Sequence, residues 1–434
     1  MRDSIGFKNF RKIHRIFIHR ISGLFLPLFV LIFLLYGGYK ALQNTHTEAL
    51  NTENRNPEQI PQLHSLSEFV GRDYQTQMEN ALPDQFPANQ YVKKLYYGAT
   101  NKALLKLFNP TFSFSDHYVS FRNKFYLYGK KDNLYIIANR HQFTPTKRKL
   151  LNEFASTVNQ ALKDNPQTNF YMYYVTLDRD IRFDNASKSG FWDYLSSRLE
   201  LPPTHTDELH VSSFEDYQKY FMRTDHHWSY LGIYEAYTQL YNILGLESQG
   251  ETQLKPIEKS PDPAQNPGKC QYERDGKTIL VSKHYCDSRG RMTGSMDLFQ
   301  EPFRAYRYQF PPMVITVEGE KVGFGDEESF FNGVRPEDQL RYREFYGYNN
   351  AETIFTTERD SRPNILVFGN SYFKPLLKMI ASHYHQTYSI DLRYYKDVKK
   401  HEFNINEYIQ EHQINEVLFI INILFIDDYH TIEL

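Results

Sequence analysis

Cysteine, tryptophan and a surplus of charge are all scarce in this 434-residue chain. It contains 2 Cys and 2 Trp, and 50 basic residues against 52 acidic ones give a formal net charge of -2. Two cysteines exclude both a disulfide-dense scaffold and a zinc module built from several cysteines. A net charge so close to zero excludes a globally basic nucleic-acid binder, so no nucleic-acid partner is expected.

The chain has instead the composition of a folded protein. Hydrophobic residues make up 41% and charged residues 24%, which argues against disorder. The length suits one large domain or two ordinary ones. Aromatic residues reach 16%, with 34 Tyr and 33 Phe. Tyrosine-rich surfaces suit sugars, although packing in a core is the commoner use of aromatic side chains.

One long run near the N-terminus lacks charged residues. Residues 21–38, ISGLFLPLFVLIFLLYGG, have about the minimum length of a transmembrane helix. Basic residues dominate the segment 1–20, so the positive-inside rule places it in the cytoplasm and the bulk of the chain outside the cell. We therefore expect a single-pass anchor in the cell membrane. A cleaved signal peptide and a buried core helix are the alternatives, but no clear cleavage site follows and the run has no polar face.

The rest of the sequence predicts an α/β domain on a stalk. Residues 39–65 are polar and predict the stalk, and residues 66–434 predict the extracytoplasmic domain. A helical pattern over 147–163 precedes an apolar strand over 169–177, and the last third alternates strand and helix. This rhythm is typical of a doubly wound parallel sheet flanked by helices.

Residues 250–335 are rich in Pro, Gly and charge and predict an inserted small lobe. Both cysteines, Cys270 and Cys286, lie in this segment. Outside the cytoplasm a disulfide between them is plausible, and two free thiols are the alternative.

The segment around Ser371 has the pattern of a nucleophile turn. An apolar strand over 364–368 leads into Gly369-Asn370-Ser371 and a helix. Ligands of open α/β sheets bind beyond the carboxyl ends of the strands, where this serine would lie. Gly369 permits a sharp turn, and backbone N–H groups at the start of the helix could hold an oxyanion. The alternative is that Ser371 only caps the helix.

A second polar cluster, Asp225-His226-His227-Trp228, precedes another helix. A serine nucleophile needs a base, and the base needs an acceptor that holds its tautomer. Asp225 and His227, two residues apart in an extended segment, would project to the same side and could be that pair. A metal site is the first alternative, but adjacent histidines seldom bind one ion and no HExxH motif is nearby. Simple helix capping is the second.

These motifs together resemble a known family. TDHHWSYLGIYEAY (224–237), VFGNSYF (367–373), DLRYY (391–395) and VLFIIN (417–422) resemble the DHHW family of bacterial cell-envelope proteins. That family is similar to the SGNH-type alginate O-acetyltransferases, in which an Asp-x-His-Trp motif precedes the serine. The resemblance covers most of residues 66–434 and implies an SGNH-hydrolase-like fold.

The resemblance also implies roles for single residues. Ser371 matches the nucleophile, His227 the base and Asp225 the residue that orients it. Gly369 and Asn370 match the oxyanion region, although Asn370 replaces the common aspartate. Arg393 in DLRYY follows a predicted strand over 387–392 and should lie at the same end of the sheet as Ser371. We expect its guanidinium to stabilise negative charge or position a glycan, with a surface ion pair as the alternative.

The function expected from the resemblance is a membrane-anchored serine O-acyltransferase. It would transfer an acyl group, most simply acetyl, to a cell-envelope or exopolysaccharide glycan through an acyl-serine, without a cofactor or metal. Related acetylation systems imply a polytopic membrane-bound O-acyltransferase as a partner. A carbohydrate acetyl esterase of the same fold and a non-catalytic glycan-binding envelope protein remain as alternatives.

Overall fold

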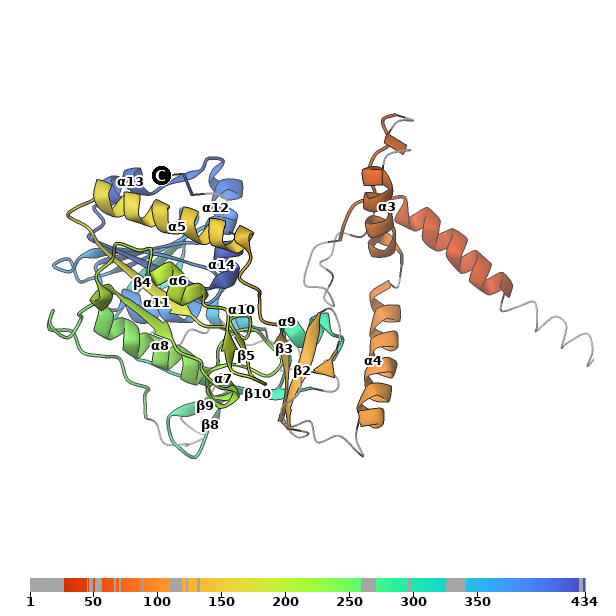
Figure 1. Ribbon diagram of the computed structural model, residues 1–434, viewed down its shortest axis with the longest axis horizontal. Coiled ribbons are helices and arrows are strands. Elements are labelled where there is room, and N and C mark those ends of the chain that lie inside the picture. Colours follow the sequence, from red (N-terminus) through yellow and green to blue (C-terminus); the bar gives the residue numbers. More distant parts are fainter. Residues whose placement is uncertain are drawn as a thin grey trace, which may run out of the picture. The chain divides into compact units, whose positions relative to one another are not determined.

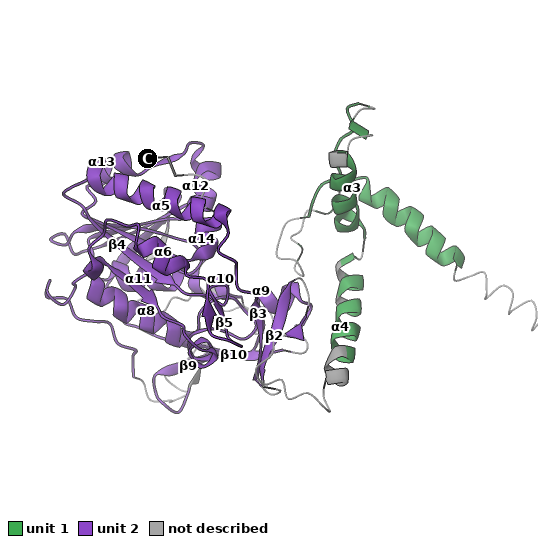
Figure 2. Cartoon of the chain, in the orientation of Figure 1, with its two compact units in different colours: residues 1–106 green, residues 107–434 purple. Residues whose placement is uncertain are grey.

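Figure 1 shows the computed structural model of the chain. The structure describes residues 27–44, 46, 50, 57–65, 68–69, 72–87, 89–108, 119–121, 124–130, 133–258, 271–295, 299–324, 341–428 and 432–433. The chain divides into two compact units, residues 1–106 and residues 107–434 (Figure 2).

The first unit is helical. It contains a helix over 27–41, followed by α3 (Arg72–Gln85) and most of α4 (Asn89–Phe108). Within the described residues, no helix combines the length and the apolar character needed to cross a membrane. Residues 1–20 and 21–26, which the sequence assigns to the cytoplasmic segment and to the start of the anchor, lie outside the described residues.

The boundary between the units differs from the one predicted at residue 66. Helices α3 and most of α4 belong to the first unit, and none of their residues with a described burial belongs to the hydrophobic core that contains Tyr128. Helix α4 instead leaves several apolar side chains exposed, namely Tyr91, Val92, Leu95 and Tyr96. Helical periodicity alone could not show which core these helices would join.

The second unit is built on an eight-stranded sheet. In spatial order the strands are β12 (Glu320–Phe324), β11 (Met313–Val317), β13 (Glu352–Thr357), β15 (Gln386–Ile390), β14 (Asn364–Gly369), β17 (Glu416–Ile421), β4 (Asn169–Val175) and β7 (Thr206–Leu209). The five strands from β15 to β7 are parallel. The prediction of a parallel sheet holds for these five only. Strands β13, β11 and β12 are antiparallel, and a tight hairpin such as the β11–β12 turn can join only antiparallel strands.

Helices cover both faces of this sheet (Figure 1). One face carries α5 (Pro145–Asp164), α13 (Ile405–Glu411) and α14 (Ile423–Asp427), and the other carries α8 (Tyr230–Ile243) and α11 (Lys374–Ala381). Helix α5 shows how the sequence sets such an element. The Thr144 side chain caps its start, and its buried residues, including Leu151, Phe154 and Val158, recur at helical spacing.

Smaller elements complete the second unit. They are β1 (Val119–Ser120), β2 (Phe125–Lys130), β3 (Asn133–Ala138), β5 (Ile181–Arg182), β6 (Ser187–Lys188), α6 (Phe191–Ser196), a 3-10 turn (Pro203–His205), α7 (Phe214–Tyr220), α10 (Tyr342–Tyr346), α12 (Leu392–Lys399), β16 (Phe403–Asn404) and β18 (Ile432–Glu433).

The predicted inserted lobe over 250–335 divides into two parts. Strands β8 (Gln271–Tyr272), β9 (Thr278–Tyr285) and β10 (Glu301–Tyr306), with α9 (Ser288–Met292), form a separate three-stranded sheet, which we call the lobe. Strands β11 and β12 extend the main sheet instead. The strand patterns in the sequence could not separate the two parts, because such a pattern predicts a strand but not the sheet that the strand joins.

Cys286, directly after β9 in the lobe, is a buried free thiol within the described residues, and its predicted disulfide with Cys270 stays a prediction. Cys270 lies outside the described residues. Burial raises the pKa of the Cys286 thiol to about 12, so the side chain behaves as a small apolar group.

The chain order creates a switch point in the sheet. From β14 the chain passes through α11 to β15 on one side, and it later returns to β17 on the other side of β14. In open α/β sheets, ligands bind beyond the carboxyl ends of strands at such a point. Ser371 follows β14 there, and Asn422 follows β17.

Candidate active site

Backbone contacts at the end of β14 position Ser371. A Cβ atom on Gly369 would lie 2.9 Å from the Ile420 carbonyl oxygen, so only glycine fits where β14 passes β17. The next residue ties the two strand ends together. The Asn370 side chain accepts a hydrogen bond from the backbone N–H of Tyr372 and donates one to Asn422 Oδ1, both at 3.2 Å.

The structure brings the predicted base to this serine. The Ser371 hydroxyl lies 2.8 Å from His227 Nε2, and His227 Nδ1 lies 3.0 Å from Asp225 Oδ2. Because Asp225 can only accept, Nδ1 carries the proton and Nε2 is left to accept the hydroxyl proton. This is the arrangement of a serine with its general base and an orienting carboxylate. The catalytic roles of the three residues remain a prediction.

Asp225 is completely buried and surrounded by donors. Its Oδ2 accepts a hydrogen bond from Tyr285 Oη at 2.7 Å, and its Oδ1 accepts bonds from Ser288 Oγ at 2.5 Å and the His226 backbone N–H at 2.7 Å. Burial alone would raise the pKa of Asp225, but interactions with His227 and His226 outweigh it, so the pKa lies well below its usual range. The carboxylate therefore stays charged behind the imidazole.

His226 differs from what an extended segment predicts. Residues 223–227 form a bend, and the His226 ring lies 3.8 Å from the His227 ring instead of pointing away. His226 Nδ1 lies 2.6 Å from Ser288 Oγ, whose own proton goes to Asp225. Burial, and then the neighbouring His227, lower the pKa of His226 to about 4, so it is neutral at pH 7.

An aromatic ring holds the plane of the base. Tyr342 stacks on His227 with the ring centres 3.8 Å apart and an interplanar angle of 3°. Its hydroxyl accepts a hydrogen bond from Trp228 Nε1 at 3.1 Å, and its backbone N–H donates to Asp287 Oδ2 at 2.8 Å. The Trp of the DHHW motif therefore acts through Tyr342 on the base that precedes it.

Strand β10 of the lobe fixes the backbone just before Asp225. Glu301 Oε2 accepts a hydrogen bond from the Arg223 N–H at 2.9 Å. Its Oε1 accepts bonds from the N–H of Thr224 at 2.8 Å and from the Thr224 hydroxyl at 2.7 Å. One buried carboxylate thus takes three donors from the two residues that lead into the motif.

Asp225, His226 and His227 are also candidate metal ligands, since their ligand atoms lie within 4.8 Å of one another. The chemistry of the donor set fits a metal poorly. Both oxygens of Asp225 already accept hydrogen bonds from neutral donors, and the second nitrogen of His227 faces Ser371. The arrangement fits proton transfer from the serine better than coordination of an ion.

Arg393 lies at the carboxyl end of β15, as predicted, because β14 and β15 are parallel neighbours and Phe368 pairs with Ile390. Its guanidinium makes a bidentate ion pair with Asp391, with Nε to Oδ1 at 2.9 Å and Nη2 to Oδ2 at 2.7 Å. A guanidinium paired in this way is a weak candidate for stabilising negative charge on a substrate, so the ion-pair alternative describes Arg393 better.

Sequence reasoning missed Tyr285, Ser288, Glu301 and Tyr342. All four come from the lobe or the segment after it, up to 117 residues from Asp225 in the chain. A partial signal was present, because the polar residues Asp287 and Ser288 follow closely on the end of a strand, as Asn370 and Ser371 do.

Neither a protein-family model nor a curated protein matches this chain. Solved structures do. A DHHW family protein from Eubacterium siraeum matches with 15% identity and a TM-score of 0.51, over 71% of this chain and 93% of its own. PatB1 of Bacillus cereus, with a sulfonyl adduct, has 17% identity, a TM-score of 0.49 and coverage of 71% and 98%.

The O-acetyltransferase domain of Pseudomonas putida AlgJ follows with 11% identity and a TM-score of 0.36, over 73% of this chain and 94% of its own. At such identities the likeness concerns the fold. The resemblance that the motifs predict thus reappears in three dimensions, and this chain shares the fold of a DHHW family protein.

Proposed function

We propose that this chain is a serine-dependent O-acyltransferase that transfers an acyl group, most simply acetyl, to a hydroxyl group of a cell-envelope glycan. The observation that carries the proposal is the 2.8 Å contact of Ser371 Oγ with His227 Nε2, backed by the 3.0 Å contact of Nδ1 with Asp225. The DHHW and serine motifs support the glycan as substrate, because they resemble those of glycan acetyltransferases.

The reaction would run in two halves. Ser371 Oγ attacks the carbonyl carbon of an acyl donor while His227 Nε2 takes its proton. The leaving group departs with that proton and leaves an ester on Ser371. An acceptor hydroxyl then gives its proton to Nε2 and attacks the ester, the carbon–Oγ bond breaks, and Ser371 regains the proton. If water replaces the acceptor, the same site is an esterase.

Acylation of the serine tests the proposal. The full chain is incubated with p-nitrophenyl acetate, and peptides are analysed by mass spectrometry. We expect one acetyl group on Ser371, no such group in Ser371→Ala, and labelling slowed by about 10³-fold or more in His227→Ala. His210→Ala, at an exposed histidine outside the site, is the matched control.

Labelling that is absent, or that survives in Ser371→Ala, would leave the non-catalytic glycan-binding protein as the better reading. Glycan ester formed in excess over free acetate would identify a transferase, and free acetate alone an esterase.

We also infer that the segment 21–38 anchors the chain in the cell membrane and that a polytopic membrane-bound O-acyltransferase supplies its acyl groups. The charge asymmetry around the apolar run supports the anchor. So does the exposure of apolar side chains on the helix over 27–41, including Leu28, Leu31 and Leu35. Protease added to intact cells should digest the chain after residue 40, whereas recovery of a soluble, cleaved form would show a signal peptide.

A further inference from the structure

Arg179 lies in the loop that directly follows β4. Strand β4 is parallel to β17, and β17 is parallel to β14, so all three carboxyl ends lie at the same edge of the sheet. Arg179 therefore shares that edge with Ser371, on the side of the switch point away from Arg393.

The guanidinium of Arg179 has few hydrogen-bond partners among the described residues. Its Nη1 donates to His141 Nε2 at 2.9 Å, and within the described part of the chain it forms no ion pair. The neighbouring carboxylate of Asp178 is already engaged, since it accepts hydrogen bonds from Arg289 at 2.8 Å and from the Ala138 N–H at 2.6 Å. Most of the hydrogen-bonding capacity of Arg179 therefore remains for another partner.

Arg179 also lies within electrostatic range of the residue that follows the predicted nucleophile. It interacts electrostatically with the hydroxyl of Tyr372, the residue after Ser371. That hydroxyl in turn donates a hydrogen bond to the His226 carbonyl oxygen at 2.5 Å. Burial lowers the pKa of the Arg179 guanidinium, and the negative charge of Asp178 opposes this shift.

We infer that Arg179 binds an anionic group, a carboxylate or a phosphate, on the glycan that accepts the acyl group. A half-buried guanidinium whose nearest carboxylate, Asp178, is paired with Arg289 is costly unless another anion completes it, and its planar fork matches both groups in a bidentate manner. The inference rests on the proposed function and gives the substrate class of the same site. Arg393 serves a different purpose, because Asp391 already occupies its fork.

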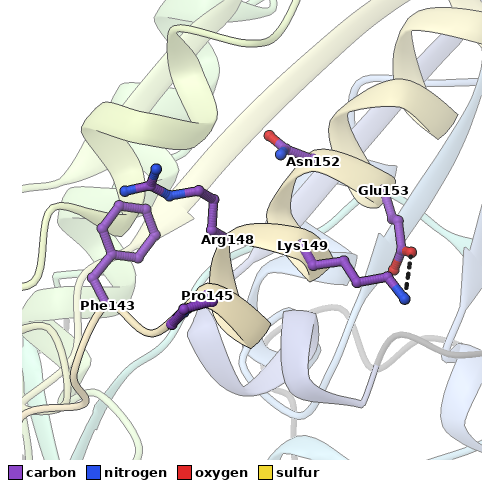
Figure 3. Close-up of a pocket in the computed structure, with 6 residues that line it drawn as sticks. All are labelled: Phe143, Pro145, Arg148, Lys149, Asn152 and Glu153. Carbon is purple, nitrogen blue, oxygen red and sulfur yellow. Dashed lines mark ion pairs between the residues drawn. The ribbon is translucent and has the colours of Figure 1, made fainter.

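The segment that follows His141, the hydrogen-bond partner of Arg179, lines a pocket into which the glycan could continue. Phe143, two residues after His141, lines a pocket of about 470 Å³ at the first turns of α5, together with Pro145, Arg148, Lys149, Asn152 and Glu153. Figure 3 shows the Arg148 guanidinium over the Phe143 ring, and its carbon lies 5.3 Å from the ring centre. An aromatic face beside exposed cations suits a chain of sugars that carries negative charge.

Binding to an inactive form tests the inference without requiring turnover. The full chain with Ser371→Ala is titrated with a galacturonic acid trisaccharide and a galactose trisaccharide, and with glucose 6-phosphate and glucose. We expect at least one anionic sugar to bind about tenfold or more tightly than its neutral partner, and the preference to weaken with salt. Comparing the two pairs distinguishes a carboxylate from a phosphate.

Adding Arg179→Gln should reduce the preference to about twofold or less, while Arg179→Lys should retain part of it because it keeps the charge but loses the fork. Arg140→Gln is the matched control, because that exposed arginine donates to the Lys188 carbonyl oxygen. Equal binding of charged and neutral sugars, or a preference that survives Arg179→Gln, would overturn the inference. Neither result bears on the proposed function, which is tested separately by the acylation of Ser371.

Discussion

The two halves of the candidate active site are held in different ways. Ser371 depends on main-chain structure, because β14, the close approach of Gly369 to β17 and the turn into α11 leave it a single position. Asp225 and His227 lie in a bend, and side chains from the lobe and from Tyr342 hold them. A nucleophile can be built into a sheet, whereas this base depends on contacts between segments far apart in the chain.

The largest effect should come from a change within the base half, at the carboxylate that orients His227. Asp225→Asn should reduce acyl transfer by about 10⁴-fold, because the amide no longer selects the tautomer in which His227 Nε2 can accept a proton. Rates of p-nitrophenol release from p-nitrophenyl acetate would measure the loss. The double variant with Ser371→Ala should be scarcely worse than Ser371→Ala alone, and additive losses would contradict the view that these residues act as a unit.

Tyr285→Phe separates the base half from the nucleophile half. It removes one hydrogen bond to a buried carboxylate, and we expect transfer to fall by about tenfold while the fold is kept. Tyr384→Phe is the matched control. Its hydroxyl donates to buried Glu416 at 2.6 Å, near the amino ends of the strands and away from the site. Equal losses in both variants would show a general effect on packing.

Gly369→Ala makes the complementary test on the nucleophile half. The added Cβ would lie 2.9 Å from the Ile420 carbonyl oxygen and from the Phe373 ring, so strands β14 and β17 would have to shift. We expect a loss of about 1–3 kcal/mol in the free energy of unfolding and a several-fold loss in turnover. Gly98→Ala, at a helical glycine with open space around it, should not destabilise the chain.

The smallest effect on turnover, but a clear one on stability, is expected at Lys374. This lysine begins α11 and is only 6% exposed. Burial lowers its pKa from 10.5 to about 8, with Asp391 opposing and Arg393 adding to the shift. Below pH 8 the folded state holds a buried charge that costs on the order of 3 kcal/mol.

This cost disappears as the pH rises from about 8 towards 10.5, where the unfolded chain binds the extra proton, so Lys374 adds a rise in stability over that range. Lys374→Met should therefore stabilise the chain at pH 7 and remove this rise. Denaturant unfolding at pH 7 and pH 9.5 measures both. A variant less stable at pH 7 would show that the ammonium group has a partner worth more than its burial costs.

Local pattern was enough for the half of the site that the sheet builds. The apolar strand, Gly369 and the helix after Ser371 are neighbours in sequence, and the positions of β4, β14, β15 and α5 followed from periodicity within a few residues. The pairing of Asp225 with His227 was predicted from their chemistry, although the extended segment assumed for their spacing is a bend. In each case the deciding contacts either join residues that are close in the sequence or are required by the chemistry of a serine nucleophile.

The remainder depended on long-range contacts. Tyr285 lies 60 residues from Asp225, and nothing near either residue indicates the hydrogen bond. The bend at 223–227, held by Glu301 from 77 to 78 residues away, replaced the extended segment in which His226 would have pointed outwards. The antiparallel edge of the sheet and the boundary between the two units have the same origin, since each is decided by the surface against which an element packs.

Alkylation of Cys286 can report on opening of the lobe. Its sulfur packs so closely against Gly290 that a Cβ there would lie 2.1 Å from it, and burial keeps the thiol protonated. A thiol reagent can reach it only when the lobe opens. The rate at which alkylated Cys286 peptide accumulates under native conditions therefore gives the frequency of opening at the place that holds Asp225. Binding of a glycan at the catalytic edge can then be followed as slower alkylation, without any chemical turnover.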